Sequence, residues 1–194
     1  MSRPEMRKLS SVVLLAAALF LSAPAAAQIA AAPPAGSAQA VAQRALTALA
    51  TRNADAFTRE SHPQELAMFR ARMLPGIQQA MNTAQKDQVL TVFAPAKTFA
   101  EIEKLPADRL FTRYLQGAMN QMSATKLQIT NTVLGQVAEG DSLAHVVYRQ
   151  RIVAGTNPPA SNVALLSLRR SPGGWKVIIE AGMMGTTGAQ PPAR

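Results

Sequence analysis

The sequence predicts an α+β protein, in which N-terminal helices pack on the concave face of a curved antiparallel sheet of about four strands. Up to residue 122, apolar residues recur at intervals of three and four, which is typical of helices with one buried face. After Ser123 they recur at every second position, which is typical of strands. Short connections rich in Gly and Pro separate the alternating segments. They favour antiparallel pairing, because parallel neighbours need a longer crossover.

The first 27 residues have the features of a cleavable secretory signal peptide: a basic start, an apolar middle and small residues before a cut after Ala27. The apolar run at 12–21 is shorter than the roughly 20 residues of a spanning helix. We therefore expect a periplasmic or secreted protein with no transmembrane anchor after processing. The expected organisation is a signal peptide (1–27), a disordered leader (28–36), a single α+β domain (37–182) and a flexible tail (183–194).

The composition narrows the possible chemistry. The chain has no cysteine, which excludes disulfides, thiol nucleophiles and thioether lipid attachment. Its formal net charge is +9, and loss of three basic residues and Glu5 with the signal peptide would leave +7. A basic protein of this kind favours anionic partners such as an anionic envelope component. Because no dense Lys/Arg run is interleaved with aromatic residues, we expect no nucleic-acid binding.

The helical part contains several start and stop signals. Ser37 can cap a first helix that ends near Asn53, and a second helical turn follows at 55–59. Ser61 and Gln64 form a capping box with a proline between them, which predicts the start of a third helix. The apolar stripe of that helix consists of Leu66, Phe69, Met73, Ile77 and Met81, and Pro75-Gly76 predicts a kink or break within it.

Two more helices are expected before the strands. Thr98 and Glu101 form a second capping box, which opens a short helix ending near Leu105. The last helix begins at Pro106. Its apolar stripe consists of Leu110, Phe111, Tyr114, Leu115, Met119 and Met122, while Arg109, Arg113 and Gln116 fall toward its other side.

Four strands are expected at 126–137, 143–153, 161–170 and 175–180. The alternation slips phase near Val133-Leu134, which predicts a β-bulge. The helix-facing residues are expected to be Ala144, Val146, Tyr148, Ile152, Trp175, Val177 and Ile179. The opposite face of the second strand carries Leu143, His145, Val147, Arg149, Arg151 and Val153, and so mixes apolar with charged residues. Such a face often meets another subunit, so we expect a possible homodimer through the sheet.

Several segments together resemble one known superfamily. An opening helix followed by "RNADAFTRESHP" (52–63), and late strands reading "AHVVYR" (144–149), "NVALLSLRR" (162–170) and "GGWKVII" (173–179), resemble the nuclear-transport-factor-2-like superfamily, a cystatin-like α+β cone. The superfamily includes ketosteroid isomerases, scytalone dehydratase and polyketide cyclases. The resemblance spans Ser37 to Glu180 and implies a cone-shaped cavity between the helices and the concave sheet.

The resemblance implies that this cavity binds a small apolar molecule or supports catalysis. The residues expected to contact a ligand are Tyr114, Tyr148 and Trp175. The leading hypothesis is non-enzymatic binding of a small apolar ligand or a protein partner. One alternative is an isomerase, dehydratase or cyclase that uses Tyr148 or Tyr114. The lack of an inward carboxylate or histidine in the strands is evidence against it. The other alternative is a structural accessory protein with a filled core.

The remaining candidate residues are histidines and a set of cations. His62 precedes a proline at a helix start, which favours a capping role, and His145 is expected on the outer sheet face. No HxH, HxxxH or CxxC pattern is present, so we expect no metal and no cofactor. The basic residues expected near one end of the sheet are Arg149, Arg151, Arg169, Arg170 and Lys176. They form either a solvated rim or an anion-binding surface facing lipid headgroups or an acidic partner.

Overall fold

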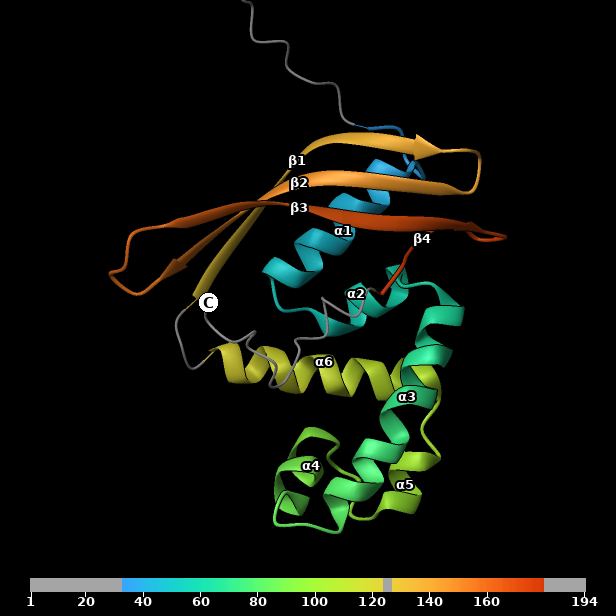
Figure 1. The fold of residues 1–194 in the computed structure, drawn as a ribbon, viewed down its shortest axis with the longest axis vertical. Helices are drawn as coiled ribbons and strands as arrows, with labels where there is room; N and C mark the ends of the chain where they lie inside the picture. Colours follow the sequence, from blue (N-terminus) through green and yellow to red (C-terminus); the bar gives the residue numbers. More distant parts are fainter. Residues whose placement is uncertain (1–32, 124–126, 180–194) are drawn as a thin grey trace, which may run out of the picture. The chain divides into compact units, whose positions relative to one another are not determined.

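The computed structural model describes residues 33–123 and 127–179. Within them, six helices precede four strands (Figure 1), which confirms the predicted α+β class. The helices are α1 (Ala38–Ala50), α2 (Ala54–Glu60), α3 (Pro63–Met81), α4 (Lys86–Val92), α5 (Phe99–Glu103) and α6 (Ala107–Ser123). The strands are β1 (Leu127–Glu139), β2 (Leu143–Ala154), β3 (Ala160–Ser171) and β4 (Gly174–Val177). The predicted signal peptide, most of the predicted leader and the predicted tail lie outside the described residues.

The four strands form one curved sheet in the order β1-β2-β3-β4, and all neighbours pair antiparallel. The register of β1 on β2 shifts between Val133 and Gly135, which confirms the bulge predicted there from the change of phase. The β1–β2 turn contains Gly140 at φ +63°, a conformation that glycine adopts without strain. The chain therefore builds the sheet as a simple meander.

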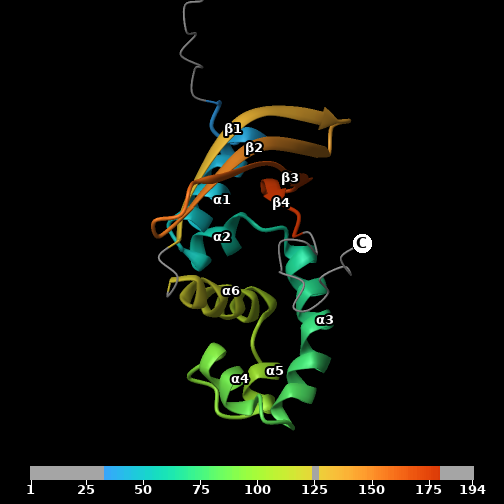
Figure 2. The same ribbon diagram turned by 60° about the vertical axis from the view of Figure 1, so that its left-hand side comes forward.

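Helix α1 lies across the concave face of the sheet (Figures 1 and 2). Its Ala42 and Ala45 are fully buried, as are Ala144 and Val146 on the facing side of β2. Small side chains at these positions allow the helix backbone to approach the strands closely. Asn131 of β1 donates a side-chain hydrogen bond to the Leu46 carbonyl at 3.2 Å, which fixes α1 on the edge of the sheet.

The predicted division of the sheet into two faces is confirmed in its central part. Tyr148, Val177 and Ile179 are buried on the side of the helices, as predicted. Ile152 and Trp175, which were assigned to the same side, are half-buried. The core is therefore densest where α1 crosses the middle of the strands.

The start of α3 differs from the prediction. His62, and not Ser61, is the N-cap, because the backbone N–H of Gln64 donates to His62 Nδ1 at 3.3 Å. The Ser61 hydroxyl instead donates to the Phe57 carbonyl in the last turn of α2 at 3.0 Å. The cause lies in β4: Ser61 forms an isolated parallel bridge with Val177, and the His62 N–H donates to the Val177 carbonyl at 2.8 Å. This extended pairing turns the Ser61 side chain back toward α2.

The other helix boundaries agree with the sequence in most places. Ser37 caps α1, and Thr98 caps α5 by accepting from the Glu101 N–H at 3.3 Å. Asn53, which was expected near the end of the first helix, is the N-cap of α2. A kink or break was predicted at Pro75-Gly76, and there is no break, because α3 is continuous through both residues. Both residues are exposed, so water can reach the carbonyl group that proline leaves without its helical donor.

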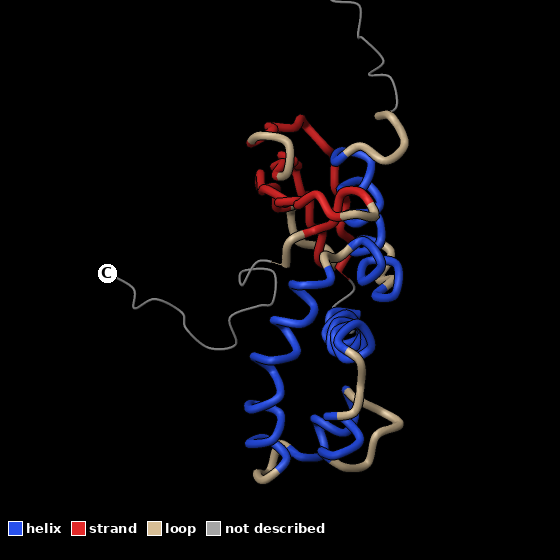
Figure 3. Tube along the Cα trace, turned by 90° about the vertical axis from the view of Figure 1, so that its right-hand side faces the viewer, coloured by secondary structure: helices blue, strands red, loops and turns tan. Residues whose placement is uncertain are grey.

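The helices beyond α2 pack mainly on one another. Helix α6 lies beside α3, as Figure 3 shows with α6 seen end-on, and α4 contacts both. Phe69 of α3 meets Phe111 of α6 edge to face, with ring centroids 5.0 Å apart. Helix α4, which the sequence did not predict, has no fully buried residue.

Candidate ligand-binding groove

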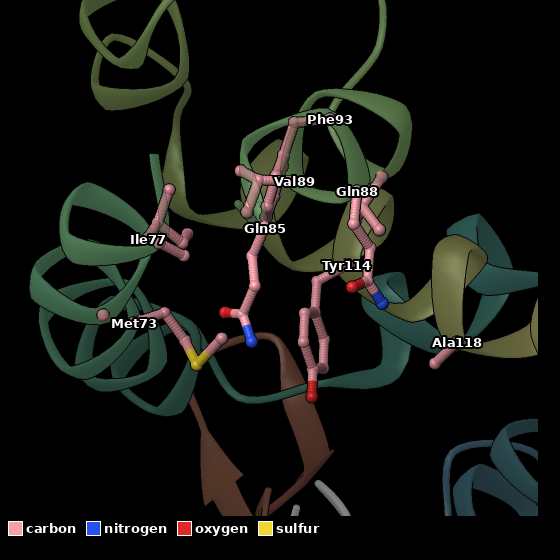
Figure 4. A pocket seen from close by; sticks show the side chains of 11 residues that line it. Met73, Ile77, Gln85, Gln88, Val89, Phe93, Tyr114 and Ala118 are labelled. Atoms are coloured by element: carbon pink, nitrogen blue, oxygen red, sulfur yellow. The ribbon is translucent and has the colours of Figure 1, made fainter. Parts of the chain in front are cut away.

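A groove with a volume of about 450 Å³ lies between α3, α4 and α6. Its walls come from three helices and from the residues directly before and after α4, and Figure 4 shows their side chains from close by. The lining residues are Met73, Gly76, Ile77, Ala80, Gln85, Gln88, Val89, Val92, Phe93, Tyr114 and Ala118.

Helical spacing places the apolar lining residues on facing sides of the three helices. Met73 and Ile77 are four residues apart on α3, and Tyr114 and Ala118 are four apart on α6, so each pair occupies one helix face. Phe93, directly after α4, is buried, and its carbonyl accepts a hydrogen bond from Arg113 Nη1 of α6 at 2.9 Å. This contact holds the end of α4 against α6 and so closes one end of the groove.

The polar lining groups are all uncharged at neutral pH. They are the carboxamides of Gln85 and Gln88 and the Tyr114 hydroxyl, and Figure 4 shows all three turned away from Phe93. The Tyr114 ring packs on Phe69 of α3, with centroids 5.2 Å apart, so its orientation is fixed by the helical core. The groove thus combines apolar walls with a small number of neutral hydrogen-bonding groups.

The three predicted ligand-contact residues occupy different environments. Tyr114 lines the groove. Tyr148 is buried with the core residues of β2, and Trp175 on β4 is half-buried beneath the Arg170 guanidinium, which lies 5.8 Å from the centre of its rings. Of the three, only Tyr114 lines this groove, because the groove lies among helices and not between the helices and the sheet.

The five predicted anion-binding residues fall into two groups. Arg169 pairs in register with Leu143 at one end of β2, whereas Arg149 is six residues further along that strand, a separation of about 20 Å at the usual rise of a strand. Arg169 forms an ion pair with Glu65 (3.7 Å), and Lys176 donates to the Arg59 carbonyl at 2.6 Å. The structure therefore does not gather the predicted cluster at one end of the sheet.

The remaining pair, Arg149 and Arg151, is exposed and makes no ion pair within the described residues. Near the pair, the outer face of the sheet exposes apolar side chains. Val163 is 60% exposed and lies opposite Arg149, and Leu165 is 53% exposed opposite Val147. The half-apolar outer face expected from the sequence is therefore present.

His145 takes part in a hydrogen-bonded chain on this outer face. Its Nε2 lies 3.0 Å from Glu139 Oε2, and its Nδ1 lies 3.1 Å from the Ser167 hydroxyl. A serine, a histidine and a carboxylate in this order also make up serine-hydrolase triads. Ser167 is only 8% exposed, however, so its hydroxyl is not presented to a substrate. We assign this chain a role in ordering the sheet surface.

The described part of the chain offers neither a cluster of metal ligands nor a membrane-spanning helix. There, no group of three or more His, Asp or Glu side chains could hold a metal ion. In the same residues, no helix has the length and apolar character needed to cross a bilayer. No known family model matches this chain, and no curated protein is significantly similar to it in sequence.

The α4 wall of the groove was missed at the level of sequence. Its signal is the short segment "KDQVLTVF" (86–93), in which Val92 and Phe93 follow Val89 by three and four residues. The segment has no side-chain cap to mark its start, since Gln85 makes no capping hydrogen bond. A search for short apolar stripes without caps would have found it.

Proposed function

We propose that this protein binds a small apolar ligand in the groove between α3, α4 and α6 and does not transform it. The observation that carries the proposal is the lining itself. A volume of about 450 Å³ lies within the range of small-molecule pockets, which are mostly apolar with a few polar groups. Among the lining residues, Tyr114 is the only ionisable one.

The same lining makes the enzymatic alternative less favourable. Isomerases, dehydratases and cyclases move protons, and the usual groups for this are His, Asp, Glu or Lys. None of these residues lines the groove. The third hypothesis is a structural accessory protein with a filled core. The tight packing of α1 on the sheet supports it for the part of the molecule that contains α1 and the strands.

Two broader expectations belong to the proposal. One is export through the signal peptide, followed by work in the periplasm or outside the cell. The other is membership of the nuclear-transport-factor-2-like superfamily, which the order of helices and antiparallel strands supports. Within that fold, the ligand site would lie among the helices beyond α2 instead of inside the cone.

The test is binding of N-phenyl-1-naphthylamine, a neutral apolar dye that fluoresces more strongly in an apolar site. The wild-type protein should bind the dye saturably. Ala118→Phe should weaken binding about tenfold or more, because the added ring fills the groove from the α6 wall. Ala67→Phe, at an exposed position of α3, is the matched control and should bind like the wild type.

Circular dichroism and thermal melting would establish that both variants are folded. Equal dye binding by Ala118→Phe and the wild type would place the dye elsewhere and remove the groove from the proposal. Absence of saturable binding by the wild type would leave the filled structural core as the better hypothesis.

A second candidate function is attachment of the outer sheet face to an anionic phospholipid surface. The exposed Val163 and Leu165 next to Arg149 and Arg151 favour it, because basic and apolar groups together complement an anionic membrane interface. Arg149→Glu/Arg151→Glu should abolish co-sedimentation with vesicles containing phosphatidylglycerol. Arg72→Glu/Lys104→Glu changes the net charge equally at exposed positions away from the sheet and should leave co-sedimentation in place.

Equal vesicle binding by the wild type and the sheet variant would reject this second function. The homodimer expected through the same face is the alternative use of it. A doubled mass in light scattering that Leu165→Glu reduces to the monomer mass would favour the dimer.

A further inference from the structure

We infer that the ligand of the groove carries an uncharged hydrogen-bonding head group, such as an amide, an alcohol or an ester, on an apolar chain. This inference rests on the proposed function. Its starting point is the common direction of the polar groups within the groove: the polar ends of Gln85, Gln88 and Tyr114 are turned away from Phe93 and Val89, toward the end where Figure 4 also shows Met73.

The polar groups of the groove suit a neutral head group. A carboxamide offers two donors and an acceptor, and a phenol offers one donor and an acceptor. Gln85 and Gln88 are three residues apart, so they lie on one side of the start of α4 and approach the same region as the Tyr114 hydroxyl. An amide, alcohol or ester can exchange hydrogen bonds with groups of both kinds.

No lining residue carries a charge that could compensate an ionised head group. Gln85 and Gln88 are exposed, so a head group beside them keeps part of its hydration. A carboxylate there still exchanges some water for neutral partners without a cation to compensate, and an ammonium does so without an anion. Arg113, the cation next to the groove on α6, already donates to the Phe93 carbonyl at 2.9 Å and is not part of the lining. Beside the glutamines, Lys86 and Asp87 are exposed and of opposite sign.

The apolar part of the groove fits the remainder of such a ligand. Ile77 from α3 and Val89 from α4 line the groove on the side of Phe93, and Met73 from α3 lies nearer the polar end of Gln85 (Figure 4). An unbranched alkyl chain can follow this apolar wall while its head group stays with the glutamines. The ligand class is therefore a single-chain amphiphile that is neutral at physiological pH.

The experiment compares three ligands of one chain length, decanamide, decanol and decanoate, at pH 7.5 and below their aggregation concentrations. Each is used to displace N-phenyl-1-naphthylamine from the full mature protein. Decanamide and decanol should displace the dye at concentrations severalfold below that of decanoate, because the carboxylate gives up part of its hydration beside exposed neutral amides without a cationic partner. The apolar chain is the same in all three.

A pair of variants links this preference to the glutamines. Gln85→Leu/Gln88→Leu removes the amide groups but retains similar side-chain volume, so the dye should still bind while the advantage of decanamide over decanoate falls severalfold. Gln78→Leu/Gln116→Leu makes the same chemical change at exposed positions outside the lining and should keep the wild-type preference.

The outcomes separate the inference from the function on which it rests. If decanoate displaces the dye as well as decanamide, or if the glutamine variant retains the full preference, the neutral head group is wrong while ligand binding stands. If the dye binds but none of the three ligands displaces it, the single-chain amphiphile is wrong. If the dye does not bind at all, the proposed function itself fails.

Discussion

Helices α1 and α4 both pack against a neighbouring layer, yet they do so to very different extents. Six of the 13 residues of α1 are buried against the sheet and α2, whereas none of the seven residues of α4 is buried. The sequences explain the difference. Helix α1 supplies Ala, Val and Leu on most of its circumference, while α4 offers Val89, Leu90 and Val92 between polar residues. Helix α1 is thus closely packed on the concave face of the sheet, and the groove lies beside the thinly packed α4.

The difference also bears on dynamics. A segment with few buried apolar groups opens with a smaller free energy than one in the densest part of the core. Helix α4 is held by half-buried residues and by the buried Phe93 at its end. The free energy of local opening should therefore be smaller for α4 than for α1 and the sheet. The proposed binding groove and the most buried part of the core occupy separate parts of the described chain.

The largest expected effect comes from the same truncation in the two helices. Leu46→Ala in α1 removes a fully buried side chain and should lower the free energy of unfolding by roughly 2–5 kcal/mol. Leu90→Ala in α4 removes a half-buried side chain and should cost less than about 1 kcal/mol. Because leucine and alanine are both good helix formers, propensity contributes little to either value. Urea unfolding followed by circular dichroism measures both. Equal losses would mean that α4 is as well supported as α1, against the packing seen here.

A smaller effect tests how firmly α4 is held against α6. A Cβ atom at Gly117 of α6 would lie 3.0 Å from Val92 Cγ1 and 3.1 Å from Cγ2, so a methyl group there presses on α4. In a Val92→Ala background those two methyl groups are gone, and Gly117→Ala should stabilise by about 0.5–1 kcal/mol through better helix propensity. In the wild-type background the contact with Val92 should offset most of this gain.

A double-mutant cycle of Gly117→Ala and Val92→Ala gives the coupling directly, which we expect to be roughly 0.5–1 kcal/mol. A coupling of zero would mean that α4 yields freely to the new methyl group. In that case the groove would have no fixed width, and a size limit for its ligand would not follow from this structure.

The comparison of α1 with α4 also shows which features a sequence can predict. Helices and strands with long apolar patterns were predicted, as was the bulge at Val133-Leu134, because a change of phase is visible along the chain. Features that depend on distant residues were not. Ser61 is displaced as a cap because Val177, more than a hundred positions away in the chain, pairs with it and with His62.

The site was predicted less well than the fold for the same reason. The groove depends on α4, a seven-residue helix without a side-chain cap, and on how three helices meet, so only Tyr114 of its lining was expected as a ligand contact. The basic residues were expected at one end of the sheet, but the β2–β3 register places Arg149 and Arg169 far apart. A local pattern contains no information on register or on helix packing.

The smallest expected effect compares two ion pairs around α2. Arg44 of α1 makes two hydrogen bonds to the Glu60 carboxylate, at 2.8 and 3.1 Å, whereas Arg109 Nη1 and Asp55 Oδ1 are 3.6 Å apart with both side chains well exposed. Arg44→Gln should lower the free energy of unfolding by up to about 1 kcal/mol, and Arg109→Gln by much less.

The two variants change the net charge equally, so the difference between them isolates the geometry. The hydrogen bond to Glu60 raises the pKa of Arg44, so Arg44 stays charged throughout the neutral range and this contribution should be constant between pH 6 and 9. It should shrink in 1 M NaCl, where screening is strong. A larger loss from Arg109→Gln, or a difference insensitive to salt, would show that the Arg44–Glu60 pair does not link α1 to α2 electrostatically.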